Sequence, residues 1–322
     1  MNYIIFDLEW NQCPDGKSGE LKELPFEIIE IGAIKLNHEL QEIGRFHEYI
    51  RPRVYRRLHF RTQEIIHVSQ QTLNEAAPFP EVIERFRQWC DTDVCYCIWG
   101  SLDFLELQRN MRYHHTENFF PFPLKYYDIQ KIFSLTFEDG KNRRTLEYAI
   151  DFLGLPKDVA FHEAISDAYY TAEVIKHIPT EKLMSFYSFD YFRTPKKRKD
   201  EIYVEFGSYT KLISREFTSK KELLRDRKIA STRCYLCNQT AKKKLRWMPS
   251  GTRNYICLAY CEQHGYLKGK LRVRHTEDGS AYYCVKTLKL IDVDHAQELC
   301  DRVMTARERR RIRKHSEDSQ AE

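Results

Sequence analysis

The chain has 322 residues, 31% of them charged, and a formal net charge of +5 at pH 7. This length allows one sizeable domain and a smaller one, and the small net charge confines any basic character to local surfaces. No apolar run approaches the roughly 18 residues that cross a bilayer, and the first residues read as a strand instead of a secretory leader. We therefore expect a cytoplasmic protein without membrane contacts. Ten cysteines, four of them in a metal-like pattern, fit a reducing compartment better than a disulfide framework.

The first strand carries two acids. The octet YIIFDLEW, beginning at Tyr3, is rich in β-branched and aromatic residues. Because side chains alternate along a strand, Asp7 and Glu9 point the same way, about 6–7 Å apart. Adjacent carboxylates repel each other, and such a pair usually holds a cation. Oxygen ligands without Cys or His beside them suit Mg²⁺ or Mn²⁺. The alternative is a strand end whose acids reach solvent.

The elements that follow describe a mixed sheet with helices on both sides. Short connections join the first strands into an antiparallel three-stranded meander, and later strands alternate with helices. The expected strands after the first cover residues 26–36, 46–50 and 126–129, and the expected helices cover residues 80–90, 102–112 and 145–153.

A third acid follows an apolar strand that ends at Gly100. Ser101 can cap a helix there, with Asp103 in the first turn. Taken alone, an Asp at this position is more typical of a capping acid. This Asp becomes informative in context, because three separate strand ends or helix starts along the chain each carry an acid.

The third of these segments is FHEAISD, which precedes a helical run. Ser166 is the expected N-cap, and Asp167 then lies in the first turn, where the helix dipole favours its charge. His162 lies on the approaching loop, where it could act as a base beside a metal. The spacing alone is weak evidence, since a structural histidine is commoner.

Together these motifs resemble the DEDDh exonucleases of the ribonuclease H-like fold, over roughly residues 1–180. The family's D-x-E motif matches Asp7 and Glu9, its second motif matches Asp103, and its H-x4-D motif matches His162 and Asp167. The residues around the second and third motifs are most similar to the Eri-type ribonuclease branch. Similarity to the proofreading subunit of bacterial replicases and to ribonuclease T is weaker.

The resemblance implies a ribonuclease H-like α/β fold and a 3′→5′ exonuclease that releases nucleoside 5′-monophosphates. Asp7, Glu9 and Asp167 would hold a first divalent ion, Mg²⁺ or Mn²⁺. Asp7 would also reach a second ion about 4 Å away, with Asp103 helping through water. His162 would be the general base. The implied partner is single-stranded RNA or DNA, with RNA favoured by the branch resemblance.

Contacts to the terminal nucleotide are harder to place. Family members often have a Thr-Gly-Ile/Val-Ser/Thr loop there, and the comparable stretch of this chain reads IHVS, with His67 where Gly is expected and Ser69 at its end. Trp10, next to the acids, could stack on the terminal base, although its side of the strand favours the core. Trp10, His67 and Ser69 are the candidate substrate-binding residues.

A composition shift marks the end of the first domain. We expect an exonuclease domain over residues 1–190, a charged linker and helix over 191–229, a zinc-binding module over 230–295 and a basic tail over 296–322. In the third of these, C-x2-C and C-x2-H pairs supply four ligands from two tight turns, the zinc-ribbon arrangement: Cys234, Cys237, Cys261 and His264. With all four ligands from protein, one Zn²⁺ would be structural. The alternative is unpaired structural cysteines.

The predicted zinc module is also rich in basic and aromatic residues: Lys242, Lys243, Lys244, Arg246, Trp247, Arg253, Tyr255, Lys268, Lys270, Arg272 and Arg274. These would suit a phosphate backbone and its bases, but a solvated basic face explains them equally well. The basic run from Arg307 to Lys314 favours a solvated tail. Two other functions stay open, a catalytically silent nucleic-acid-binding adaptor and a nucleotide- or dinucleotide-specific hydrolase of the same fold. The sequence does not identify protein partners, which stay unknown.

Overall fold

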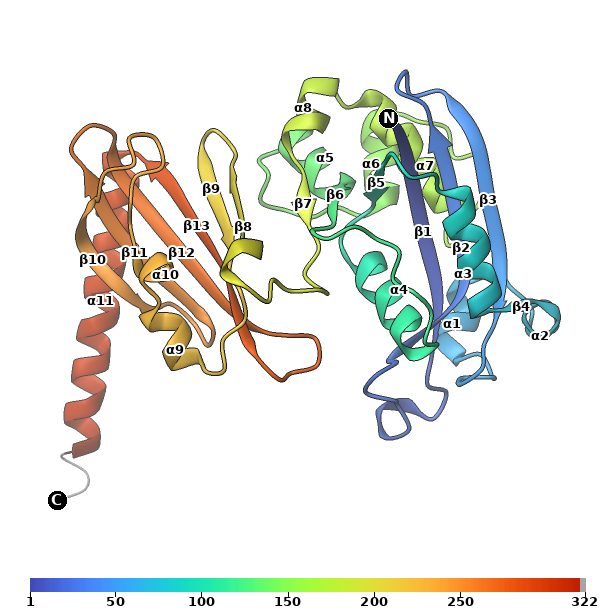
Figure 1. Ribbon diagram of the computed structural model, residues 1–322, viewed down its shortest axis with the longest axis horizontal. Coiled ribbons are helices and arrows are strands. Elements are labelled where there is room, and N and C mark those ends of the chain that lie inside the picture. The colour runs from blue at the N-terminus through green and yellow to red at the C-terminus, as the bar shows by residue number, and fades with distance from the viewer. Residues whose placement is uncertain (319–322) are drawn as a thin grey trace. The chain divides into compact units, whose positions relative to one another are not determined.

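The computed structural model describes residues 1–318, with side chains described through Thr305. The chain divides into two compact units, Met1–Phe192 and Arg193–Glu322, each with its own sheet (Figure 1). Within the described residues, no helix has the length and apolarity that a membrane crossing requires.

The first unit is built on a seven-stranded mixed sheet in the order β4-β3-β2-β1-β5-β6-β7. The first three strands form the expected antiparallel meander, and β1 then pairs in parallel with β5. The strands are β1 (Asn2–Gln12), β2 (Phe26–Leu36), β3 (Glu42–Arg51), β4 (Ala77–Pro78), β5 (Val94–Ile98), β6 (Lys125–Asp128) and β7 (Ser188–Phe189).

Helices cover both faces of this sheet, so β1 is buried on both sides (Figure 1). Phe6 packs in one core with α3 and α4, and Ile5 packs in the other with α5, α6 and α7. The helices are α1 (Phe60–Ile65), α2 (Gln70–Glu75), α3 (Phe79–Trp89), α4 (Leu102–Tyr113), α5 (Ile129–Phe137), α6 (Leu146–Leu153), α7 (Ala164–His177) and α8 (Thr180–Ser185), with the 3-10 turn η1 (Gly16–Ser18). The expected mixed α/β architecture is confirmed.

The second unit is built on a six-stranded antiparallel sheet in the order β10-β11-β12-β13-β9-β8. Its strands are β8 (Ile202–Glu205), β9 (Tyr209–Ile213), β10 (Lys242–Pro249), β11 (Asn254–Cys261), β12 (Gly265–His275) and β13 (Tyr282–Ile291). Its helices are η2 (Arg198–Asp200), α9 (Lys220–Arg225), α10 (Arg227–Ala230) and α11 (Val293–Asp318).

Residues 191–229, which the sequence suggests as a charged linker, a short strand and a charged helix, contribute two strands to this sheet. Strand β9 pairs with β13, from Ile213 opposite Val285 to Tyr209 opposite Lys289. Leu212 and Ile213 are buried by this pairing. Residues 193–229 therefore belong to the second unit, and most of their charged side chains lie outside the two strands, before β8 and in α9 and α10.

The C-terminal residues form one long helix, α11. Its first turns pack Ala296, Leu299 and Val303 against Ile256 and Leu258 of β11. The side chains of the basic run from Arg307 to Lys314 lie outside the described residues.

Candidate active site

Four carboxyl groups from three distant segments gather beside β1. Asp7 and Glu9 project from the strand, Asp103 lies in the first turn of α4, and Asp167 lies in the first turn of α7. Burial raises the pKa of Asp7 well above its usual value, and the charges of Asp103, Asp167 and Glu9 raise it further. The structure thus brings together the acids that the sequence motifs single out.

The pKa values of the other three acids are raised in the same way. The pKa is raised to about 8 for Glu9, to about 7 for Asp103 and to about 6 for Asp167, and burial is the largest cause in each case. Neighbouring acids contribute to each of these increases, while the His162 ring and its backbone N–H lower the pKa of Asp167. A cluster of this kind is stabilised by cations, which favour the charged forms of all its members.

Two further observations fit a cation at this place. Glu9, His162 and Asp167 each offer a ligand atom, and these atoms lie within 4.8 Å of one another. The Oδ1 atom of Asp167 is buried without a hydrogen-bond partner, which is costly unless a ligand satisfies it. Carboxylate oxygens are the donors that Mg²⁺ and Mn²⁺ prefer.

His162 lies at the exposed edge of this cluster. Its backbone has a φ of 66°, a left-handed conformation that is uncommon for a residue with a side chain. Such strain persists only where the surroundings impose it, and it concentrates at functional sites. The exposed ring beside Asp167 can exchange protons with solvent.

The start of α7 differs from the expectation. The helix begins at Ala164 with Glu163 in the N-cap position, so the prediction of Ser166 as N-cap is wrong, and Ser166 lies inside the first turn. The reason is tertiary packing against β2. A Cβ atom on Gly32 would lie only 2.0 Å from the backbone nitrogen of Ile165, so the absence of a side chain at Gly32 lets the helix approach. Ser101 does precede α4, but its side chain makes no capping hydrogen bond.

Glu30 is a buried acid of the site that the motifs do not reveal. It lies on β2 directly opposite Glu9 and has no exposed surface. Its Oε1 atom accepts the backbone N–H of Ala164 at 3.1 Å and contacts the Nε2 atom of His47 at 2.8 Å. Glu30 therefore ties the start of α7, and with it Asp167, to the central sheet. The signal in the sequence is the acid within the apolar stretch IIEIGAI of β2.

The three candidate substrate-binding residues differ in how far their side chains are engaged in the fold. Trp10 is half-buried and packs with the apolar core, its ring 5.5 Å from that of Phe26. Ser69 caps α2 by accepting the backbone N–H of Thr72 at 3.0 Å. His67 is exposed on the loop between α1 and α2. Of the three, His67 has the side chain least engaged in the fold.

A separate cluster in the second unit matches the predicted zinc ligands. The Cys234 and Cys261 sulfurs each lie 3.7 Å from Nδ1 of His264, and the Cys237 and Cys261 sulfurs lie 3.5 Å apart. Tetrahedral zinc with its usual bond lengths requires ligand separations of about 3.5–3.8 Å. One turn precedes β10 and the other joins β11 to β12, so the donor set fits a closed, structural zinc site.

Comparisons with known proteins agree with the geometry of the first unit. The mouse and rat proteins named 3′-5′ exoribonuclease 1 are 27% and 25% identical to this chain over 186 and 185 residues, in each case 54% of this chain and 52% of the relative. This chain thus spans about half the length of the curated relatives it matches.

The fold also matches a solved structure, the nuclease domain of 3′hExo, a DEDDh family member bound to rAMP. The TM-score is 0.50 at 21% identity, and the match covers 59% of this chain and 96% of that domain. The resemblance to DEDDh exonucleases is confirmed. A model of the family described as Exonuclease matches residues 4–175, which is more than half of the chain. The protein belongs to this Exonuclease family.

Proposed function

We propose that the protein is a metal-dependent 3′→5′ exonuclease that releases nucleoside 5′-monophosphates from single-stranded nucleic acid, with RNA preferred over DNA. The observation that carries this proposal is the cluster of carboxyl groups around Asp7 with His162 at its exposed edge. Family membership supports the exonuclease chemistry, and the names of the mouse and rat relatives support RNA as substrate. The free cysteines support the reducing cytoplasm as its compartment.

The proposed cofactors are two Mg²⁺ or Mn²⁺ ions held by Asp7, Glu9, Asp103 and Asp167. When bound, such ions neutralise the charge of the phosphodiester and lower the pKa of water so that hydroxide forms at neutral pH. The raised pKa values of these acids and the unpartnered Oδ1 of Asp167 support their assignment as ligands.

The residues of the chain have separate tasks in this mechanism. A ring nitrogen of His162 takes the proton of the attacking water and passes it to solvent, for which its exposed position is suitable. Asp167 stabilises the imidazolium that forms when His162 takes the proton, since the opposite charges of the two groups attract each other. The hydrogen bond from the Ala164 N–H to Glu30 and the close approach at Gly32 hold the start of α7, and with it Asp167, against the sheet.

A catalytically silent adaptor and a nucleotide- or dinucleotide-specific hydrolase are the alternatives. Clustered acids cost stability through mutual repulsion, and a protein that only binds nucleic acid gains nothing from retaining all of them. Cleavage rates that depend on oligomer length distinguish an exonuclease from a hydrolase of small nucleotides.

The decisive experiment incubates the full-length protein and Mg²⁺ with single-stranded RNA and DNA labelled at either end. We expect 5′-labelled RNA to shorten stepwise and 3′-labelled RNA to release labelled mononucleotide at once. Asp7→Asn should abolish both, whereas Asp15→Asn, which changes an exposed acid outside the cluster, should not. Release of a 5′ label as the first product would exclude the proposed polarity, and absence of cleavage would favour the adaptor.

The second unit has a basic face, on the side of its sheet against which α11 packs. Along β12, Lys268, Lys270 and Arg272 alternate with buried residues and so share one side of the sheet. Lys268 lies directly opposite Lys289 of β13, and burial together with nearby cations lowers the pKa of Lys268. Like charges in opposite positions are destabilising, and a phosphate backbone would neutralise them. We propose that this face binds single-stranded nucleic acid.

The aromatic residues expected to stack on bases do not join this face. The indole N–H of Trp247 donates to the Ala230 carbonyl at 3.1 Å, and Trp247 and Tyr255 pack against the core around Leu271. The proposed binding is therefore electrostatic. Replacing Lys268 and Lys270 with Gln should reduce the salt slope of RNA binding by about 0.7 per lost contact, and an unchanged slope would remove this face from the proposal.

A further inference from the structure

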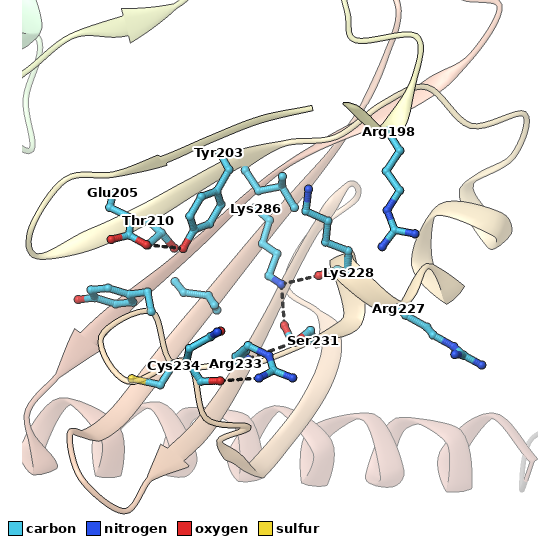
Figure 2. Close-up of a pocket in the computed structure, with 14 residues that line it drawn as sticks. Arg198, Tyr203, Glu205, Thr210, Arg227, Lys228, Ser231, Arg233, Cys234 and Lys286 are labelled. Atoms are coloured by element: carbon cyan, nitrogen blue, oxygen red, sulfur yellow. Dashed lines mark hydrogen bonds between the residues drawn. The ribbon is translucent and has the colours of Figure 1, made fainter. Parts of the chain in front are cut away.

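A cavity of about 770 Å³ lies within the second unit (Figure 2). It is on the opposite side of the sheet from the basic face. Its walls come from β8, β9 and β13, from α10, and from the turn that carries Cys234. Lys286 and Leu288 of β13 point into it, whereas their neighbours Thr287 and Lys289 lie on the basic face. The cavity is thus separate both from the acids of the first unit and from the proposed backbone-binding face.

The lining of this cavity has an excess of positive charge. One of its side chains is a carboxylate, Glu205, and five are cations: Arg198, Arg227, Lys228, Arg233 and Lys286. Glu205 accepts the hydroxyl of Tyr203 at 3.1 Å, and Lys228 pairs with the buried Glu201 at 2.7 Å. Even with that pair formed, the remaining cations outnumber the acids, so the cavity attracts anions.

Lys286 provides the strongest indication. It is only 6% exposed, and its ammonium donates to the carbonyl oxygens of Lys228 at 3.0 Å and Ser231 at 2.6 Å. Both acceptors are uncharged, and no carboxylate among the described side chains forms an ion pair with it. Burial lowers the pKa of Lys286 to about 8, and the charge of nearby Asp226 opposes this only in part. An anion bound in the cavity would stabilise the ammonium further.

The two ends of the cavity differ in chemistry, since one is aromatic and uncharged and the other is basic. Tyr203 and Thr210 lie together at one end in Figure 2, Arg198 and Lys228 lie at the other, and Lys286 lies between them. Leu212 and Leu288 add apolar surface. Ligand sites of small molecules typically have volumes of about 300–1,000 Å³, so inorganic phosphate would leave most of this space empty. A ring system joined to a phosphate matches the size and both kinds of lining.

We propose that this cavity binds a nucleotide, with its phosphate on Lys286, Arg198 and Arg233 and its base toward Tyr203. The phosphate could belong to a free nucleoside monophosphate or to one unit of a single strand, and the two share this chemistry. The site lies wholly within the second unit, so its occupancy does not depend on the exonuclease activity of the first.

The test measures binding of AMP to the full-length protein by isothermal titration calorimetry. Asp7→Asn is present in every sample and no divalent metal is added, so that the acid cluster neither binds AMP through metal ions nor cleaves a competing RNA. We expect AMP to bind, inorganic phosphate to compete weakly, and adenosine without phosphate to bind far less. Lys286→Met should weaken AMP binding by about tenfold or more, and Arg198→Gln by about threefold to tenfold.

The matched control is Lys221→Met, which removes one exposed cation of the same unit outside the cavity and should leave affinity within about twofold. Arg198→Gln changes an exposed side chain and keeps the test valid if Lys286→Met folds poorly. Competition between AMP and a short RNA that depends on Lys286 would identify a strand unit as a second source of the phosphate. Equal binding of AMP and adenosine, or AMP affinity unchanged in both cavity variants, would overturn the proposal.

Discussion

Replacement of Gly32 by Ala tests whether the close approach of α7 to β2 sets the geometry of the candidate active site. The added Cβ would lie 2.0 Å from the nitrogen of Ile165 and 2.1 Å from the carbonyl carbon of Ala164, against an ordinary contact of at least 3.4 Å. Both obstacles are backbone atoms, so no side-chain rotation can relieve the overlap. The first turn of α7 must retreat from the sheet by roughly 1 Å or more and carry Asp167 with it.

The expected magnitudes follow from this displacement. Overpacking of a well-packed core costs about 1–3 kcal/mol, which corresponds to a fall of very roughly 5 °C in the unfolding temperature of a unit of this size. A catalytic group misplaced by 1 Å can lose about 10²-fold in rate. We therefore expect kcat/KM on labelled single-stranded RNA to fall by about 10²-fold, far more than the loss of stability explains at the assay temperature.

Gly44→Ala is the matched control for Gly32→Ala. Gly44 lies on β3 of the same sheet, and its added Cβ would meet the ring of Trp89 at 3.6 Å, which is an ordinary contact. We expect unfolding and kcat/KM close to those of the parent protein, within about 0.5 kcal/mol. A Gly32→Ala protein with parental rate and parental unfolding temperature would refute the role assigned to this close approach.

Four further outcomes are expected. His162→Ala should slow RNA cleavage by about 10²–10⁴-fold, while Mg²⁺ still raises the unfolding temperature of this variant. Asp167→Asn should instead lose the effect of Mg²⁺ on the unfolding temperature. A parental cleavage rate in His162→Ala would exclude His162 as the base. Glu30→Ala leaves the Ala164 N–H without its acceptor and should destabilise the first unit by about 1–3 kcal/mol, whereas Glu30→Gln keeps an acceptor and should cost less in the same thermal unfolding measurement. Without added divalent metal, the free energy of unfolding should fall as the pH rises from about 5 to 8. In the folded protein Glu9 has a pKa of about 8 and keeps its proton over most of this range, whereas the unfolded chain has already released it. A flat profile, or an equal slope with saturating Mg²⁺, would contradict the electrostatic account. Cys237→Ser should release one zinc per chain and unfold the second unit, and elemental analysis that finds no zinc in the parent protein would reject the site.

Local sequence patterns predicted most of the first unit. The apolar run of residues 26–36 coincides with β2, because a strand buried on both faces leaves a continuous hydrophobic signal. The acids at strand ends and helix starts were found for a similar reason, since each follows an apolar strand or opens a helix.

What the sequence did not predict depends on contacts between distant residues. Glu30 meets the start of α7 across 134 residues of chain, and no local pattern contains that distance. The helix begins before Ser166 because Gly32 lets it pack there, a tertiary effect that outweighs capping preference. The sequence suggests one short strand where β8 and β9 lie, and the second becomes recognisable only through the pairing of β9 with β8 and β13.

Strand β10 is an edge strand of the second sheet, so its lysines affect self-association as well as ligand binding. An outermost strand offers unpaired backbone groups that can recruit a strand from another molecule, and charged side chains and irregular pairing discourage this. Lys242, Lys243 and Lys244 are exposed at the start of β10, and its register with β11 shifts between Lys243 and Leu245. Independently of any anion that they bind, these lysines therefore oppose aggregation in which strands of other molecules add to this edge of the sheet.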